Sequence, residues 1–464
     1  MKKTGFMRQL FCGILAMILL AMPVGAVAEN DMSVTQGCRT IDGRKALDSK
    51  DERLVKTVSA LLYDVTNDVV VYADNPDAQF SPAGLAKIMT CLIVAENADM
   101  NDRVVVKQEV LDTMYSLNRG LDLQAGEELS VQDLMYCLMV KGANIAATIL
   151  ADHVAGSQEA FVQMMNEKAA ELGCTDTNFV NVHGLSDELQ LTTARDVAKI
   201  VVAGMENEYF EEAFCTYVVR IPATNMAEER KISSENFLFN RNLGSNHFDG
   251  RAIGSRMGLT GNGENNIVVV AEKNDIQLIS IVLGSTSEIN PNGEEGCYKE
   301  ARILLDKGFD EYVHVNVLHD NQILEQFRVE NGDCDVSGYV KVNASTSLPA
   351  KATDANLTYR FTLEQSAIKA PVKKDDQIAT VEVWYENVCL AQAPMFATNR
   401  VSVQEKVVLD ETVAESDGGA FTVLTIVAVI VGLLVILMFG KPVLFRIIHN
   451  RKQKQHRRYQ RRSR

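Results

Sequence analysis

The sequence lacks the residue patterns of several common functional classes. No two of its nine cysteines have Cys-x-x-Cys spacing, and its seven histidines are scattered, so it indicates neither a metal site nor a cofactor. Positive charge is scarce in the body of the chain. The formal net charge is −15, but three Lys or Arg precede residue 29 and ten follow residue 440, which leaves −28 on residues 29–440. So acidic a body excludes a nucleic-acid partner.

The N-terminus has the features of a secretory signal. Lys2, Lys3 and Arg8 precede an apolar run at residues 10–22, and an Ala-Val-Ala cleavage site follows. We therefore expect a signal peptide over residues 1–28.

The C-terminus has the features of a membrane anchor. Residues 420–439 carry no charge over 20 positions, enough to span a hydrocarbon core of roughly 30 Å. Ten Lys or Arg and no acidic residue follow in residues 441–464. Because basic flanks stay cytoplasmic, we expect a single transmembrane helix at 420–440, a basic tail inside the cell and the body outside it, held at the cytoplasmic membrane. The acidic, glycine-containing residues 410–419 form a linker.

The pattern of apolar residues between these ends predicts a mixed α/β domain. Apolar, β-rich runs separated by short polar turns indicate hairpins, and serine before an apolar run marks the start of a helix. Helices and strands are interspersed without a regular βαβ alternation. The predicted elements are hairpins at 59–65/69–72 and 267–270/278–283, and helices at 84–96, 131–140 and 158–172.

Three short segments carry the strongest functional signal. Residues 82–90 read Pro-Ala-Gly-Leu-Ala-Lys-Ile-Met-Thr, residues 142–147 read Gly-Ala-Asn-Ile-Ala-Ala, and residues 254–260 read Gly-Ser-Arg-Met-Gly-Leu-Thr. They resemble the three motifs of the penicillin-binding D-alanyl-D-alanine carboxypeptidases. In that family the segments read Pro-Ala-Ser-x-Thr-Lys-Ile-Met-Thr, Ser-x-Asn-Asp-Ala-Ala and Gly-Ile-Lys-Thr-Gly-Tyr-Thr.

The first motif retains its base and lacks its nucleophile. The resemblance places the acylated serine at Gly84 and its general base at Lys87. A serine and a lysine at i+3 share a helix face, so the lysine can take the hydroxyl proton. Glycine can be neither acylated nor deprotonated. Ser81 lies near the wrong side of such a helix, and Thr90 occupies a position where the family has threonine as well as its serine.

The other two motifs have lost their hydroxyls too. Gly142 stands where the resemblance implies a proton-shuttling serine, while Asn144, which would hold the substrate's peptide carbonyl, is kept. In the third motif Arg256 replaces lysine, Met257 replaces the threonine that would bind a terminal carboxylate, and Gly258 is retained. Arginine keeps the positive charge but is a broad, planar donor rather than a point charge. Every hydroxyl in the three motifs that does chemistry is absent.

The resemblance extends beyond the motifs. Residues 161–185, including His183 as a structural loop histidine, match the family nearly residue for residue. The likeness covers about residues 45–312 strongly and 313–409 weakly. It implies a β-lactamase/transpeptidase-like fold, an antiparallel sheet flanked by helices with an inserted helical lobe. We place the N-terminal linker at 29–50 and this domain at 51–312.

The sequence pattern of residues 313–409 predicts a small all-β domain. Runs at 313–317 and 381–385 alternate between apolar and polar residues, and 336–342 has β character. Eight cysteines remain after the signal peptide, an even number that invites a disulfide reading, and Cys334 with Cys389 is the candidate pair to test in this part. Cys91 and Cys137, within apolar helical runs, are expected to be buried free thiols.

Three functions remain compatible with the sequence. The first is a membrane-anchored extracytoplasmic pseudoenzyme that binds a peptidoglycan stem peptide or a cell-wall enzyme. The second is an active serine-type D-Ala-D-Ala carboxypeptidase with another nucleophile, which requires Ser81, Thr90 or Ser255 within reach of Lys87. The third is a structural interaction protein with a vestigial pocket filled by side chains.

Overall fold

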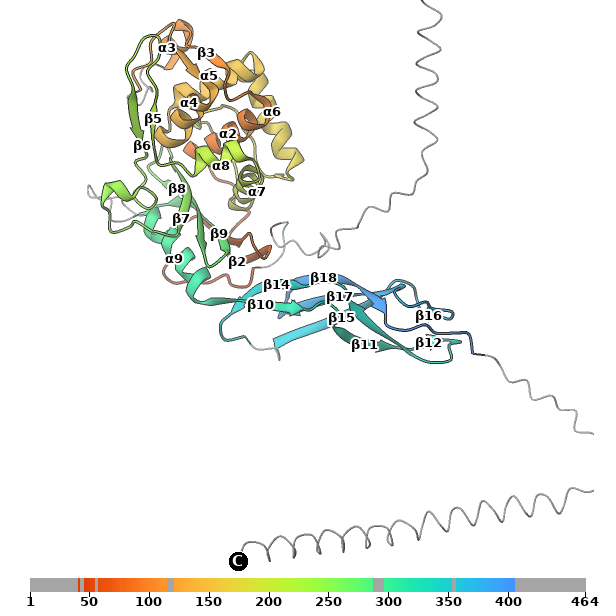
Figure 1. Cartoon of the computed structure of the whole chain (residues 1–464). Helices are drawn as coiled ribbons and strands as arrows, with labels where there is room; N and C mark the ends of the chain where they lie inside the picture. Colours follow the sequence, from red (N-terminus) through yellow and green to blue (C-terminus); the bar gives the residue numbers. More distant parts are fainter. Residues whose placement is uncertain are drawn as a thin grey trace, which may run out of the picture. The chain divides into compact units, whose positions relative to one another are not determined.

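The computed structural model describes residues 41, 46–54, 57–114, 121–286, 296–352 and 356–404 (Figure 1). The predicted signal peptide, linker 410–419, transmembrane helix and basic tail lie outside the described residues. Within them, no helix is long and apolar enough to cross a membrane. The helices are η3 (Ala83–Leu85), α2 (Ala86–Asn97), α3 (Gln108–Met114), α4 (Val131–Tyr136), η5 (Cys137–Lys141), α5 (Asn144–Ala155), α6 (Gln158–Glu171), α7 (Ala194–Met205), α8 (Glu208–Phe214), η6 (Arg241–Leu243) and α9 (Cys297–Asp310).

A five-stranded antiparallel sheet organises the first part of the chain. Its strand order is β2-β1-β9-β8-β7, so β7 is an edge strand. Both predicted hairpins are confirmed: β1 pairs with β2, and β8 pairs with β9 through a turn in which Asn274 and Asp275 have φ of 54° and 64°. The strands are β1 (Ser59–Asp64), β2 (Val69–Asp74), β7 (Ala252–Leu259), β8 (Asn265–Lys273) and β9 (Ile276–Ser285), with two small two-stranded antiparallel sheets, β3 (Arg103–Val105)/β4 (Glu128–Ser130) and β5 (Val218–Ile221)/β6 (Arg230–Ser233).

The sheet separates two hydrophobic clusters. Because side chains alternate along a strand, Leu61 and Tyr63 of β1 pack in the cluster with α2, α5 and α7, whereas Ala60 and Leu62 pack in the cluster with α9. Residues 47 and 48 also hydrogen-bond along β2, at 3.0 Å each, so contact with the sheet begins within the segment predicted as a linker.

The helical lobe follows the predicted caps. The Ser130 side chain accepts a hydrogen bond from the Asp133 N–H at the start of α4, and the Ser157 side chain does the same for Ala160 in α6. Helix α2 is buried over ten successive positions, as expected for its continuously apolar sequence. The helix from Val131 changes to a π-helical turn, η5, and ends at Gly142 with φ of 75°.

An all-β module follows α9. Its main sheet has the order β11-β13-β18-β17-β15, and the predicted runs 313–317, 336–342 and 381–385 form β10, β13 and β17. The mixed α/β fold with a C-terminal all-β part is therefore confirmed. The strands are β10 (Tyr312–Leu318), β11 (Ile323–Phe327), β12 (Val329–Glu330), β13 (Val336–Val340), β14 (Ala344–Pro349), β15 (Leu357–Leu363), β16 (Ile368–Lys369), β17 (Gln377–Tyr385) and β18 (Val388–Ala397).

The expected cysteine pair is wrong. Cys389 is disulfide-bonded, but Cys334 is an exposed free thiol, so the two are not joined. Spacing within one β domain does not determine which cysteines approach each other, which is why the sequence misassigned this pair. Cys91 and Cys137 are buried free thiols, as expected, and burial raises the pKa of both.

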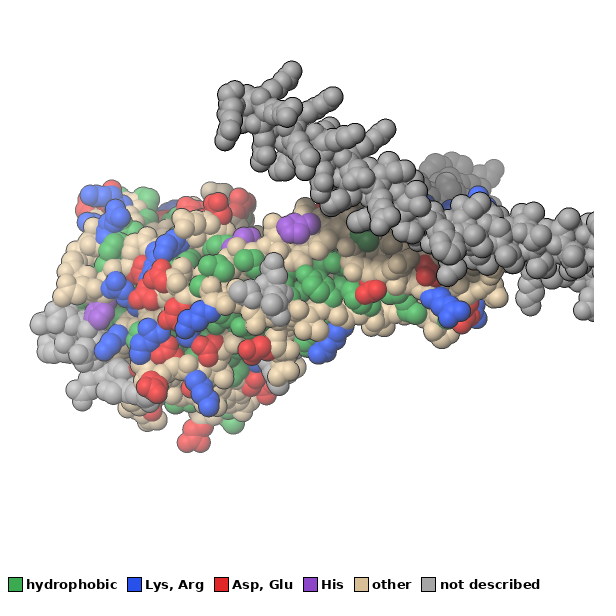
Figure 2. All heavy atoms as spheres, turned by 90° about the horizontal axis from the view of Figure 1, so that it is seen from below, with side chains coloured by type: hydrophobic (Ala, Val, Ile, Leu, Met, Phe, Trp, Pro, Cys, Tyr) green, Lys and Arg blue, Asp and Glu red, His purple; other side chains and the backbone are tan. Residues whose placement is uncertain are grey.

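The surface mixes charges of both signs. On the face drawn in Figure 2, acidic and basic side chains are interspersed over the larger part of the molecule. The acidic side chains visible on this face are therefore not gathered in one patch.

Candidate functional site

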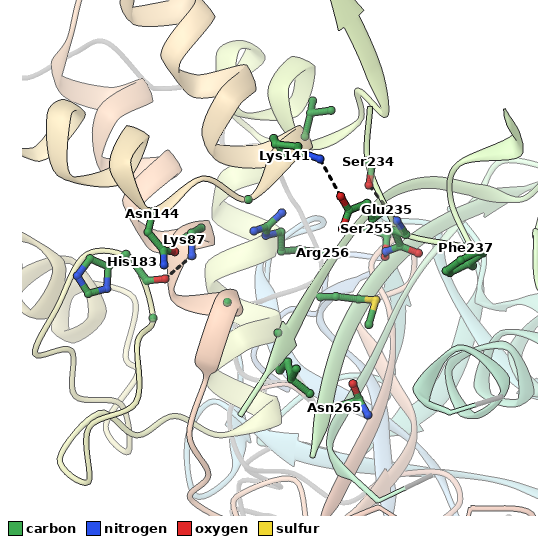
Figure 3. Close-up of a pocket in the computed structure, with 18 of the residues that line it drawn as sticks. Lys87, Lys141, Asn144, His183, Ser234, Glu235, Phe237, Ser255, Arg256 and Asn265 are labelled. Carbon is green, nitrogen blue, oxygen red and sulfur yellow. Dashed lines mark hydrogen bonds and ion pairs between the residues drawn. The ribbon is translucent and has the colours of Figure 1, made fainter. Parts of the chain in front are cut away.

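One cavity of about 380 Å³ brings the predicted site residues together (Figure 3). Its walls come from α2, the junction between η5 and α5, and the edge strand β7. The structure brings the predicted site residues close together, and their roles stay predictions. All seven line the cavity: Gly84, Lys87, Gly142, Asn144, Arg256, Met257 and Gly258.

Lys87 is held by a neighbouring loop. Lys87 is in α2 and is only 3% exposed. Its ammonium donates a hydrogen bond to the backbone carbonyl of His183. One turn on, the Thr90 hydroxyl donates to the Val182 carbonyl at 2.6 Å. Two side chains of one helix face thus bind successive carbonyls of the loop. Asn144, the first residue of α5, points into the same part of the cavity (Figure 3).

Position 84 has no room for a side chain. A Cβ placed on Gly84 would lie 2.6 Å from the carbonyl oxygen of Met257, and one placed on Gly258 would lie 2.6 Å from the Gly84 nitrogen. The start of the helix and β7 therefore touch backbone to backbone. Asn266 of β8 fixes this contact, because its amide donates to the Ser81 carbonyl at 2.8 Å and to the Pro82 carbonyl at 3.2 Å.

The second motif is also packed closely against the third, here through a side chain. Gly142 has φ of 75°, a conformation that favours glycine. A Cβ there would lie 2.6 Å from a terminal nitrogen of Arg256, whose guanidinium also donates to the Met139 carbonyl at 2.8 Å. The Arg256 guanidinium therefore occupies the space beside Gly142.

Met257, in the third motif, gives this wall of the cavity an apolar side chain. The half-buried Met257 side chain packs against the hydrophobic cluster on the α9 side of the sheet, which contains Ile267 and Tyr298. A thioether there supplies no hydroxyl for a carboxylate.

His183 has the structural role expected of it. Its Nδ1 accepts a hydrogen bond from the Leu185 N–H at 3.3 Å. Burial, with the nearby Lys87 charge, lowers the pKa of the imidazole to about 4, so the ring is neutral at physiological pH. The ammonium of Lys87 thus faces the backbone carbonyl of a neutral histidine.

Two of the three candidate replacement nucleophiles are already engaged. The Thr90 hydroxyl donates to Val182, and the Ser255 hydroxyl donates to the Val268 carbonyl at 2.8 Å. Ser81 precedes η3 and is not among the described residues that line the cavity. The arrangement does not favour any of them as a nucleophile.

Sequence analysis missed the charged pair at the mouth of the cavity. Lys141 and Glu235 form an ion pair of 2.7 Å, drawn as a dashed line in Figure 3. The position of Lys141 directly before the second motif is a usable signal. Glu235 lies in an irregular segment after β6, outside every motif, and only the fold brings it to the site.

Comparison with known proteins identifies the family. Residues 47–287 match the D-alanyl-D-alanine carboxypeptidase family, and residues 312–403 match the C-terminal domain of penicillin-binding protein 5. The chain is 30% identical over 357 residues to D-alanyl-D-alanine carboxypeptidase DacC of Escherichia coli K12, covering 74% of this chain and 83% of that protein. The chain belongs to the D-alanyl-D-alanine carboxypeptidase family.

Other members and solved structures agree with this assignment. Carboxypeptidase DacF of Bacillus subtilis is 25% identical over 343 residues, covering 73% of this chain and 84% of that protein. Penicillin-binding protein 5 of Haemophilus influenzae has the same fold, with a TM-score of 0.58 at 24% identity over 75% of this chain and 98% of that one. DacD of Francisella tularensis gives a TM-score of 0.61 at 20% identity, covering 75% and 94%. The family is one of serine-type hydrolases.

Proposed function

We propose that this chain is a membrane-anchored, extracytoplasmic pseudoenzyme of the D-alanyl-D-alanine carboxypeptidase family. It acts in cell-wall metabolism by binding, with a peptidoglycan stem peptide or a cell-wall enzyme as its ligand. Neither metal nor cofactor takes part.

One observation carries this proposal. Gly84 provides no nucleophile, and the carbonyl of Met257 lies where a side chain at position 84 would begin. Beside this closed contact the cavity of about 380 Å³ remains, lined by Lys87 and Asn144. A site that has lost its reactive group while keeping a cavity supports binding rather than acyl transfer.

The charges of the cavity support an anionic or peptide ligand. Lys87, Lys141 and Arg256 line it, and these donors suit carbonyl and carboxylate oxygens. In a body that is acidic overall, this local excess of positive charge attracts the carboxylate end of a peptide.

Anchoring belongs to the same proposal. The signal peptide at 1–28 exports the body, the helix at 420–440 holds it at the cytoplasmic membrane, and the basic tail remains inside. Membrane fractionation combined with protease treatment of intact cells tests this topology. Protection of residues 51–404 from the protease would refute it.

Acylation by a fluorescent penicillin tests the loss of chemistry. The detergent-solubilised full chain is incubated with saturating drug and its intact mass is measured, with an active family member as the positive control. We expect no covalent adduct. A stoichiometric adduct would refute the proposal and support the alternative of an active carboxypeptidase with another nucleophile, which peptide mapping would locate.

A vestigial pocket in a purely structural protein is the remaining alternative. The open cavity beside Lys87 and Asn144 disfavours it, because a vestigial pocket is expected to be filled by side chains. Titration of synthetic stem peptides onto the full chain separates the two, since a structural protein binds none of them.

A further inference from the structure

One asparagine in the cavity wall has a buried carbonyl oxygen that no described residue satisfies. Asn265, the first residue of β8, lines the cavity and is only 4% exposed. Its Oδ1 is buried without a hydrogen-bond partner among the described residues. Buried polar groups are nearly always hydrogen-bonded, because leaving one unpaired costs stability. An unpaired carboxamide oxygen at the wall of a cavity therefore indicates a contact that a ligand supplies.

The next residue on the strand shows what a structural asparagine does here. The Asn266 amide donates to the Ser81 and Pro82 carbonyls at 2.8 and 3.2 Å. Its Oδ1 accepts a hydrogen bond from the Gly284 N–H at 2.9 Å. Because side chains alternate along a strand, Asn265 faces the opposite side of the sheet. Of these two successive asparagines, Asn266 holds the strand against η3, and Asn265 has no comparable role.

The face that carries Asn265 is apolar. Asn265 pairs with Leu259 across β7 and β8, and Ile267 pairs with Met257, so the four side chains share one face of the sheet. Ile267 belongs to the hydrophobic cluster on the α9 side. The part of the cavity on this face is called the strand-side compartment, and it is lined by Phe237, Met257, Leu259, Asn265 and Tyr298.

The charged residues of the cavity wall lie elsewhere. Lys87 is in α2 and Lys141 ends η5. The Arg256 guanidinium and the Glu235 carboxylate both bind residues of η5. Figure 3 draws Asn265 well apart from Lys87 and Arg256. A ligand group in the strand-side compartment therefore meets one carboxamide and apolar walls, with no charged side chain among the described residues that line it.

This environment selects an uncharged group that both donates and accepts hydrogen bonds. A carboxylate accepts only, so it would leave the Asn265 Oδ1 unpaired and would lose its hydration beside Met257 and Phe237. An ammonium donates only, and it would be desolvated there without an opposite charge. A carboxamide donates through its N–H and accepts through its oxygen, so it matches both halves of the Asn265 side chain.

We propose that the strand-side compartment binds the carboxamide side chain of a glutamine or asparagine that a protein partner inserts into the cavity. This carboxamide donates to the Asn265 Oδ1 and accepts from the Asn265 N–H, and Met257 and Phe237 cover its methylene groups. Leu259 is 62% exposed, so it extends the apolar wall to the surface beside the inserted side chain. The inference rests on the proposed function, because it names the side chain by which a protein partner enters the cavity.

Urea denaturation of the full chain in detergent tests whether Asn265 lacks a structural role. Asn265→Leu removes the unpaired carboxamide at similar volume, so the denaturation midpoint should stay unchanged or rise. Asn266→Leu is the matched control on the same strand, and it should lower the midpoint because it leaves the Gly284 N–H and the Ser81 carbonyl unpaired. An equal fall in both variants would overturn the inference.

Three blocked tripeptides test the side-chain preference. Each is an acetyl-Ala-Xaa-Ala amide, with Gln, Glu or Met as three central side chains of similar length, and ligand-observed NMR gives each Kd on the full chain in detergent. We expect the Gln peptide to bind about fivefold to twentyfold tighter than the Met peptide, because two hydrogen bonds form in an apolar surrounding. Binding of the Glu peptide should not depend on Asn265.

Substitutions at two cavity asparagines assign the preference. Asn265→Leu should make the Gln and Met peptides bind equally. Asn144→Leu is the matched control, because Asn144 also lines the cavity but begins α5 on the helical lobe, and the Gln preference should survive it. A Gln preference that Asn265→Leu removes and Asn144→Leu keeps supports the proposal.

The remaining outcomes separate this inference from its premise. Absence of binding by all three peptides, equal binding of Gln and Met, or a Gln preference that survives Asn265→Leu would overturn the subsite. None of these results concerns acyl transfer. A penicillin adduct on the natural chain would instead refute the proposed function, whatever the tripeptides do.

Discussion

A serine introduced at position 84 should damage the fold and should not make the site reactive. The new Cβ would lie 2.6 Å from the Met257 carbonyl oxygen, whereas ordinary contact begins at 3.4 Å, so two backbone segments must separate by about 0.8 Å. Asn266 resists this movement through its bonds to Ser81 and Pro82. Overpacking of this kind destabilises by about 1–3 kcal/mol.

Urea denaturation and penicillin acylation measure the two consequences. Gly84→Ser should lower the free energy of unfolding by that amount and form no adduct, because Gly142 and Met257 remain unchanged. Gly84→Ala is the matched control, since it adds the same Cβ without a hydroxyl and should be destabilised about equally. A Gly84→Ser variant as stable as the natural chain that is stoichiometrically acylated would refute the reasoning about this contact.

Three further changes probe the same site. Gly142→Ala should lower the free energy of unfolding by about 1–3 kcal/mol, because the new Cβ is placed in a left-handed backbone conformation and against the Arg256 guanidinium. In urea titrations, adding Arg256→Lys should recover part of this loss. Strictly additive effects of the two substitutions would contradict the packing described. Lys87→Met leaves the His183 carbonyl short of its charged donor, and should lower stability by about 1–3 kcal/mol and speed amide exchange in that loop. The unfolded state takes up a proton on His183 below pH 6.5, but the native state does so only near pH 4, so the free energy of unfolding should fall by up to about 3 kcal/mol as pH decreases across this window. The His183→Asn variant should flatten that part of the pH–stability curve, and an unchanged curve would show that His183 is not its cause.

Local sequence signals were sufficient for most of the fold. Serines at positions 130 and 157 cap helices because their side chains accept bonds from the backbone two or three residues on, and this preference is independent of the rest of the chain. The turn at Asn274 and Asp275 could also be predicted, because few other residue types adopt the positive φ angles that it requires. Motif spacing also placed seven residues that line one cavity.

Contacts between segments that are distant in the chain could not be predicted from the sequence. Lys141 and Glu235 are 94 residues apart in sequence, and no periodicity relates them. The close approach of Met257 to Gly84 depends on how β7 lies against η3, which a sequence motif does not specify. The Cys334–Cys389 error has the same origin, because disulfide pairing requires distances that composition does not supply.

The glycines of the first two motifs are linked to the third motif by packing. The backbone of β7 lies against Gly84, and Arg256 on the same strand fills the space beside Gly142, so each glycine accommodates the present position of the third motif. A side chain at Gly84 conflicts with the backbone of that strand, and one at Gly142 conflicts with the Arg256 guanidinium, so both positions are coupled to the third motif. Here the contacts are closed at both glycines while the neighbouring cavity stays open, and this combination agrees with the binding function proposed for the site.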